Sequence, residues 1–165
     1  MSNDKSMDLR NLKKFFLNKI SVNEIVTEIN SEVESFRIAR VKGGASCPVH
    51  GTHENFEFTI KEKDVTKLCE MYLQGKLNEW HLEYLCNLLE LSFSFSMANE
   101  RVADAVFELS SPEINGAIDR GTVNRIYDRL QAHEGRDRKR RQTLTIKGPE
   151  KKAVAAPLKT DKYSA

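Results

Sequence analysis

The sequence predicts a compact, mainly α-helical domain of about six helices with one small β-hairpin and a disordered basic C-terminal tail. Apolar residues recur every three or four positions through much of residues 9–131, which is the spacing of helices that bury one face. Residues 56–60 instead alternate apolar and polar side chains, as a half-buried strand does. Beyond residue 131 this periodicity is lost and basic residues accumulate, which favours disorder.

The distribution of charge divides the chain at the same place. The whole sequence has a formal net charge of +2, but residues 132–165 hold ten Lys/Arg against four Asp/Glu, so they carry +6 and residues 1–131 carry −4. An acidic body and a basic tail attract different partners. We therefore predict a frayed N-terminus over residues 1–8, a helical domain over residues 9–131 and a basic flexible tail over residues 132–165.

The domain is expected to begin with two helices. The first carries a short apolar stripe made of Leu9, Leu12, Phe15, Phe16 and Ile20. Ser21 and Glu24 then form the S-x-x-E pattern of a capping box, in which each side chain bonds the backbone of the other residue at a helix start. The second helix should continue to about Arg40 and end at Gly43-Gly44, because glycine commonly terminates helices.

The segment from residue 42 to residue 60 interrupts the helices. Its first part, KGGASCPVHGTH, holds three glycines and one proline, which favours a loop or an edge strand. We expect Ala45 to Val49 to pair with Phe56 to Ile60 across a turn at Gly51, which forms a hairpin near residues 45–60. Because a two-stranded hairpin is barely stable by itself, it should lie against the helices.

Two central helices between Asp64 and Leu91 hold the densest run of large apolar residues in the sequence. The first has a single apolar stripe and should end at Gly75, while the second should begin at Asn78, a favoured N-cap residue. The apolar positions of the second helix are Leu82, Leu85, Cys86, Leu88, Leu89 and Leu91. They spread over more than one stripe, so this helix needs packing partners on several sides and is predicted to form the core.

Two further helices should complete the domain. Residues 92–100 are expected to form a linker, in which Ser96 or Asn99 caps the next helix. Pro112 should end that helix, because proline cannot continue the backbone hydrogen-bond ladder. The last helix is expected to begin at Asp119 and to end near Leu130.

Cysteine and histidine are too sparse to predict a metal or cofactor site. Cys47, His50 and His53 are spaced as C-x2-H-x2-H, which matches no usual structural zinc site and lacks a fourth ligand, so a polar turn is expected there. Cys69 and Cys86 lie on apolar helix faces, where free cysteine behaves as a small core residue. No cofactor is predicted, and free thiols are expected.

Acidic residues repeat along two of the predicted helices. Glu100, Asp104 and Glu108 follow one another at four-residue intervals, which aligns them on one helix side, and Glu79 and Glu83 lie on the preceding helix. Such rows can attract a basic protein, but ordinary solvated helix faces look the same, and both interpretations stay open. Acid–base catalysis by paired carboxylates is less favoured, because no nucleophile is indicated. The residues predicted to contact a partner are Glu79, Trp80, Glu83, Glu100, Asp104 and Glu108.

A basic run marks the start of the tail. Its residues are Arg138, Lys139, Arg140 and Arg141. Such runs contact phosphate backbones without sequence preference, and they also occur in tails that only increase solubility. No aromatic residue is interleaved with them, so recognition of single strands by base stacking is poorly supported.

The central stretch LCEMYLQGKLNEWHLEYLCNLLEL, with FELSSPEING after it, resembles a small helical family of immunity proteins from bacterial polymorphic toxin systems. The matching elements are the G-K-L of residues 75–77, the N-E-W-x-L-x-Y of residues 78–84 and the P-E-I-N-G of residues 112–116. The likeness covers about Leu9 to Leu130, and the basic tail departs from it. The resemblance implies a protein that blocks a cognate toxin, but it transfers no functional residue.

Several classes of function remain after these observations. The first is a protein-binding inhibitor of the immunity type, whose partner is a toxin. The alternatives are a nucleic-acid-associated regulatory protein that uses the basic tail, and a helical adaptor module. An enzyme is not expected, because no catalytic motif is present. The sequence has no run of 18 apolar residues and no signal-peptide pattern, so we expect a cytoplasmic protein without a membrane partner.

Overall fold

The computed structural model describes residues 6–43, 49, 51–52 and 55–146, and this part of the chain is mainly helical, which confirms the predicted fold class. The helices are α1 (Leu9–Phe16), α2 (Val22–Lys42), α3 (Glu62–Leu73), α4 (Glu79–Leu91), α5 (Glu100–Ser110), α6 (Pro112–Asn115) and α7 (Arg120–Ile146). The strands are β1 (Met7–Asp8), β2 (Gly51–Thr52), β3 (Phe58–Ile60) and β4 (Phe95–Met97). None of the described helices is long and apolar enough to span a membrane.

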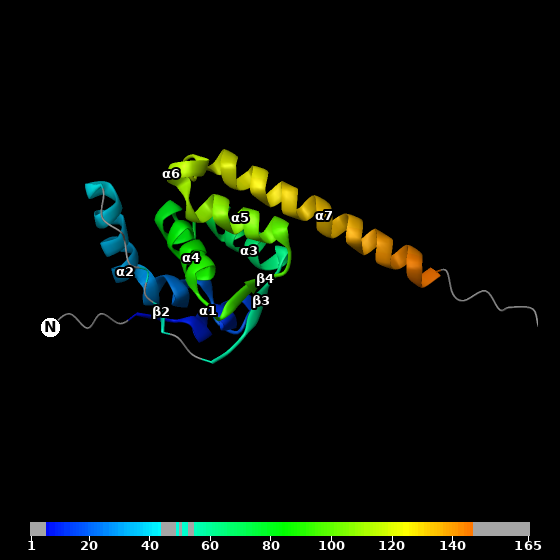
Figure 1. Cartoon of the computed structure of the whole chain (residues 1–165), viewed down its shortest axis with the longest axis horizontal. Helices are drawn as coiled ribbons and strands as arrows, with labels where there is room; N and C mark the ends of the chain where they lie inside the picture. Colours follow the sequence, from blue (N-terminus) through cyan, green and yellow to red (C-terminus); the bar gives the residue numbers. More distant parts are fainter. Residues whose placement is uncertain (1–5, 44–48, 50, 53–54, 147–165) are drawn as a thin grey trace, which may run out of the picture.

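Helix α4 is the core helix, as its broad apolar surface predicts. It packs between α2 and α5, while α3, α5 and α7 contact one another (Figure 1). The side chains of Leu82, Leu85 and Cys86 are completely buried, and Leu88 and Leu89 are nearly so. A helix that touches neighbours on several sides has little surface left for solvent, which explains why its polar positions are also partly covered.

The predicted helix ends are confirmed where local chemistry sets them. At the start of α2, the backbone N–H of Ser21 donates to the Glu24 carboxylate at 2.7 Å, and the N–H of Glu24 donates to Ser21 Oγ at 3.3 Å. Asn78 caps α4 by accepting from the N–H of His81 at 2.9 Å. Gly75 has a φ of 74° just after α3, which is the left-handed conformation that glycine adopts without strain.

Of the predicted hairpin, the strand near Phe56 to Ile60 exists as β3, but Gly51, predicted as the turn, lies in β2 and pairs with Met7. β3 pairs in parallel with β4, which brings Phe58 opposite Phe95 and Ile60 opposite Met97. Residues 92–100, predicted as a linker, therefore contain a strand. The sequence of β4 also alternates, with Phe95 buried and Ser96 exposed. Alternation identifies a half-buried strand but does not identify its partner. Of the proposed first strand, residues 45–48 lie outside the described residues.

The N-terminal boundary also differs from the prediction. Met7 is completely buried, and β1 pairs in parallel with β2 through Met7 opposite Gly51 and Asp8 opposite Thr52. Asp8 then caps α1 by accepting from the N–H of Arg10 at 2.9 Å. The ordered domain therefore begins before residue 9. Residues 1–5 lie outside the described residues.

Helix α7 is longer than the sequence analysis predicts. It continues past Leu130 to Ile146, so residues 132–146 are helical where a flexible tail is expected, and their end projects beyond the body (Figure 1). Val123, Ile126 and Leu130 are completely buried and fix the first half of the helix. A helix that is already nucleated extends at low cost through arginine and lysine, which are good helix formers. The loss of apolar periodicity after residue 131 therefore indicates that the helix is no longer buried, and it does not indicate that the helix ends. Residues 147–165 lie outside the described residues.

Candidate partner-binding surface

The six residues predicted to contact a partner occupy three different environments. Glu79, Glu100 and Asp104 are exposed. Trp80 is half-buried and packs against the core, so at least part of its side chain serves the fold. The remaining two, Glu83 and Glu108, hold arginines of other helices. The structure therefore does not present the six residues as one continuous acidic face.

Glu83 is not an exposed docking residue, which corrects the prediction. Its side chain is only 5 % exposed, because the last turns of α2 cover it. Arg40 donates to Glu83 Oε1 from Nε at 2.9 Å and from Nη2 at 2.6 Å, and it also contacts the exposed Glu113 of α6 at 2.5 Å. Burial raises the pKa of the Glu83 carboxyl, although the attraction of Arg40 opposes this change. Glu83 thus links α4 to α2, and through Arg40 to α6.

Aromatic packing around this ion pair fixes α2 on α4. The rings of Phe36 and Tyr84 meet edge to face with centroids 5.7 Å apart, and the guanidinium of Arg40 lies 5.7 Å from the Phe36 ring centroid. The Tyr84 hydroxyl donates to the carboxylate of Glu32. Burial and this carboxylate both raise the pKa of Tyr84. The α2–α4 contact is therefore a structural junction and not a free binding surface.

Glu108 is also used within the fold. It accepts from Arg129 Nη1 at 2.6 Å and from Arg125 Nη2 at 3.2 Å, so it links α5 to α7. Of the acids spaced four residues apart on α5, Glu100 and Asp104 face solvent and Glu108 faces α7. Equal spacing places the three on one general side of the helix, but the neighbouring helix covers only the last of them.

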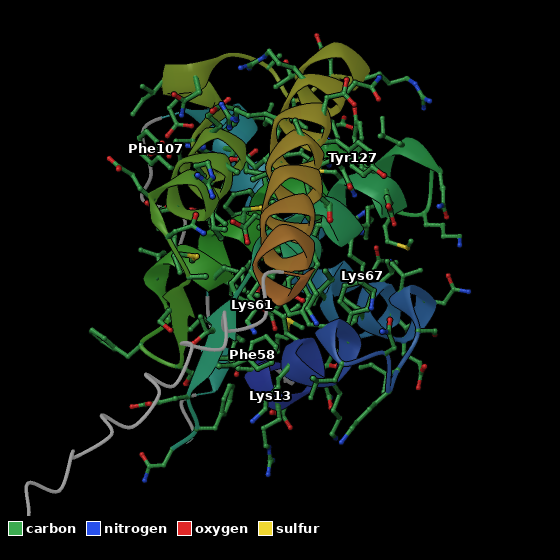
Figure 2. All side chains as sticks on the ribbon, turned by 90° about the vertical axis from the view of Figure 1, so that its right-hand side faces the viewer. Lys13, Phe58, Lys61, Lys67, Phe107 and Tyr127 are labelled. Carbon is green, nitrogen blue, oxygen red and sulfur yellow. The ribbon has the colours of Figure 1, made fainter. Side chains whose placement is uncertain are left out.

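An exposed aromatic residue that the sequence analysis did not select lies beside the two exposed acids. Phe107 is 41 % exposed and lies three residues after Asp104 and seven after Glu100. Figure 2 shows Phe107 at the edge of the molecule. The buried stripe of α5 runs through Val102, Ala105, Val106 and Leu109. A large aromatic residue outside that stripe is a signal that could have identified Phe107 from the sequence.

Two more exposed apolar residues lie on α4 and α6, which hydrogen bonds join to the second half of α5. Leu91, the last residue of α4, is 61 % exposed, and Ile114 of α6 is 70 % exposed. Ser110 Oγ connects the ends of α4 and α5 by donating to Glu90, and Asn115 Nδ2 of α6 donates to the carbonyl of Phe107 at 3.2 Å. We call Leu91, Glu100, Asp104, Phe107 and Ile114 the α5 surface. Large apolar groups beside acids are typical of protein interfaces.

The two described cysteines selected from the sequence are core residues without a reactive thiol. Cys69 and Cys86 are buried free thiols, as predicted; burial raises the pKa of Cys69 to about 12 and that of Cys86 well above its ordinary value. Among the described residues, no group of three or more His, Cys, Asp or Glu side chains could hold a metal ion. Cys47, His50 and His53 lie outside the described residues. Arg138, Lys139, Arg140 and Arg141 lie in the projecting part of α7.

A polar groove between α1 and α2 has a volume of about 740 Å³. Its carboxylates already serve the fold. Glu28 accepts from the N–H of Asp8 and from Nδ2 of Asn11, both at 2.9 Å, and Glu24 belongs to the cap of α2. These bonds hold the N-terminus against α2 and leave the groove without an evident reactive group.

Comparison with known proteins found no family model, no curated protein and no solved structure that matches this chain. The fold and its surface define a mainly α domain that carries an exposed apolar and acidic helix. The resemblance to immunity proteins stays a prediction.

Proposed function

We propose that this chain is a protein-binding inhibitor that neutralises a bacterial toxin by covering part of its surface, as the resemblance to immunity proteins implies. The α5 surface is the observation that supports this proposal. It places Phe107 next to Asp104 on a helix whose other face is buried in the core. An exposed aromatic residue is a frequent energetic centre of protein interfaces, and neighbouring charges steer the encounter with an oppositely charged partner.

The α5 surface is held rigidly, which favours tight binding. Asn99 caps α5 by accepting from the N–H of Val102 at 3.1 Å, and its Nδ2 donates to Glu62 of α3 at 2.7 Å. At the other end, Asn87 Nδ2 of α4 donates to the carbonyl of Ser110 at 3.0 Å. A helix fixed at both ends loses little conformational entropy when a partner binds. Inhibition then needs no reaction, only occlusion of the partner's site.

The proposal can be tested by growth rescue. Secreted-toxin domains encoded next to this gene would be expressed in a bacterial host with and without this chain, and colony counts would be compared. The wild-type chain should restore growth. Phe107→Ser should weaken rescue and speed dissociation of the purified complex by about tenfold or more, because a central aromatic contact is commonly worth 2 kcal/mol or more.

A charge variant separates steering from contact. Asp104→Lys should slow association in 50 mM salt and have a smaller effect in 500 mM salt, because exposed charges are screened by ions. Glu34→Lys is the matched control, since Glu34 is an exposed acid on α2 that pairs with Arg37 on the same helix. Absence of rescue by the wild-type chain would refute the inhibitor proposal. Rescue that survives both changes on α5 would move the interface elsewhere.

A further inference from the structure

The end of the body from which α7 projects carries a group of lysines. Lys13 comes from α1, Lys61 immediately precedes α3, and Lys67 lies within α3. Figure 2 shows Lys61, Phe58 and Lys13 below the C-terminal end of α7, which points toward the viewer, and Lys67 to its right. Residues that are far apart in sequence thus form one basic surface next to the projecting helix.

None of the ion pairs between described residues neutralises these lysines. Lys67 Nζ donates to two neutral oxygens, the carbonyl of Phe15 and Oδ1 of Asn18. Lys13 Nζ lies 5.2 Å from the ring centroid of Phe56 and 6.0 Å from that of Phe58. Neutral partners fix the position of an ammonium group without cancelling its charge. The buried Asp64 carboxylate attracts Lys61 and Lys67 but forms an ion pair with neither, so this surface still attracts anions.

Three acids lie near these lysines and reduce the positive charge to different extents. Asp64 is buried and accepts from the backbone N–H of Lys61 at 2.9 Å. Glu62 accepts from Asn99 Nδ2 at 2.7 Å and lies 3.6 Å from Arg101. Glu57 is exposed and reduces the positive charge locally. The positive charge at this end of the body therefore depends on Lys13, Lys61 and Lys67 together with the projecting part of α7.

The projecting part of α7 adds a second group of basic residues. Leu130 is completely buried, whereas Ala132 and Gly135 are exposed, so the helix leaves the core between these positions. Residues 132–146 form about 22 Å of helix at 1.5 Å per residue. They hold five basic and two acidic residues. The spacing of Arg136, Lys139 and Arg140 places these positions on one side of the helix.

We propose that the projecting part of α7 and the lysines at its base form one binding site for double-stranded DNA. An α-helix fits the major groove of B-form DNA, and basic groups at its base can contact the flanking phosphates. This site lies on elements other than the α5 surface. It does not depend on the toxin-inhibitor proposal.

The aromatic contacts favour a duplex over a single strand. Phe58 already stacks on Phe16 with an interplanar angle of 8°, and it meets Phe95 edge to face. Phe56 also packs edge to face on Phe95 and lies beneath Lys13. Binding of single strands relies on aromatic faces that are free to stack on bases. Because these rings are engaged within the fold, the surface offers charge to a phosphate backbone and little stacking area to bases.

The test is a titration of the full-length chain against a fluorescein-labelled 24-base-pair DNA duplex of arbitrary sequence, followed by fluorescence anisotropy. Five phosphate contacts predict a slope of about −4.5 in a plot of log K against log salt, hence roughly 500-fold weaker binding in 200 mM than in 50 mM salt. The triple change Arg136→Gln, Lys139→Gln and Arg140→Gln should reduce the magnitude of this slope by about 2.7.

The decisive variant replaces two of the three body lysines, keeps Lys67 with its bonds to Phe15 and Asn18, and leaves α7 unchanged. Lys13→Gln with Lys61→Gln should reduce the slope by about 1.8, whereas binding by an independent basic helix would be unaffected. Lys42→Gln with Lys76→Gln is the matched control, because both residues are exposed and belong to neither group. Circular dichroism checks that each variant remains folded.

Three outcomes would overturn the proposal. The first is no binding to the duplex at 50 mM salt. The second is a double variant at Lys13 and Lys61 that binds as the wild type does. The third is equal or tighter binding of a 24-nucleotide single strand or a 24-base-pair RNA duplex, because the A-form major groove is too narrow for a helix.

Discussion

Replacement of Arg40 by methionine should destabilise the protein strongly, because it leaves the carboxylate of Glu83 buried without its partner. The side chain of Glu83 is 5 % exposed and that of Arg40 is 30 % exposed. Removal of one member of a buried ion pair commonly costs about 3–5 kcal/mol. Since Arg40 is partly exposed, we expect about 3 kcal/mol. Methionine preserves much of the aliphatic packing against Phe36, so the change mainly reports on charge.

Urea unfolding followed by circular dichroism at pH 7 measures this cost. For a protein of this size, 3 kcal/mol corresponds to a fall of roughly 6–12 °C in Tm. The double variant Arg40→Met with Glu83→Met should recover most of the loss, because neither charge then remains buried. Glu113→Gln is the control and should cost less than about 1 kcal/mol, since the Glu113 side chain is 52 % exposed.

The pH dependence of the same variant gives an independent check. Burial already raises the pKa of Glu83, and loss of Arg40 removes the attraction that opposes this rise. The carboxylate can then escape its unfavourable charge by taking up a proton. The deficit of Arg40→Met relative to the wild type should therefore shrink as the pH falls from 7 toward 5. A deficit below about 0.5 kcal/mol at pH 7, or a double variant as unstable as the sum of the two single variants, would refute the reasoning.

Other predictions concern the thiols, two glycines and a buried histidine. Cys69 and Cys86 should remain unmodified by iodoacetamide in the folded protein and react only in urea, as peptide mass mapping would show, because both are buried with raised pKa values. Gly75→Ala should lower the unfolding free energy by about 1 kcal/mol in urea, because Gly75 has a positive φ, and a gain in stability would contradict this account. Gly135→Ala should instead increase the circular-dichroism signal of helix at 222 nm, because Gly135 lies within α7. Burial lowers the pKa of His81, so below about pH 6.5 the unfolded chain binds a proton at this residue more readily than the folded protein does. The unfolding free energy should therefore fall as the pH drops from 7 to 5, and it should fall less steeply in His81→Gln.

Features that depend on a few neighbouring residues could be predicted from the sequence. The capping box of Ser21 and Glu24 is one example, and the left-handed Gly75 is another. The burial of Cys69 and Cys86 also follows from their place on apolar stripes. In each case the interacting groups lie within about one helical turn, so their relative position is fixed once the helix forms.

The candidate site was only partly predictable for the opposite reason. The acids of α4 and α5 were selected by their spacing, but spacing does not show what covers each one. Arg40 is 43 residues from Glu83 in sequence, so the residues around Glu83 do not indicate that Arg40 is its partner. The charge pattern of α5 does not point to Phe107, whereas its position outside the apolar stripe does.

Strand pairing shows more clearly that residue spacing does not identify a partner distant in sequence. The alternation around Phe58 predicted a strand, and a nearby hairpin was the simplest pairing for it. The actual partner, Phe95, lies beyond α3 and α4 in the chain. Strand pairing joins residues that only the packing of the intervening helices brings together, and a period of two is compatible with any partner.

By itself, the sequence determined the mainly helical class, most helix starts and ends, and the central position of α4, because helical hydrogen bonds and caps join residues only three or four positions apart. The tertiary structure alone decided that Glu83 and Glu108 hold arginines while Asp104 faces solvent. It also decided that α7 continues from a buried first half into a projecting basic second half. Exposure and ion pairing depend on which distant elements meet, and these meetings are set by the packing of the whole core.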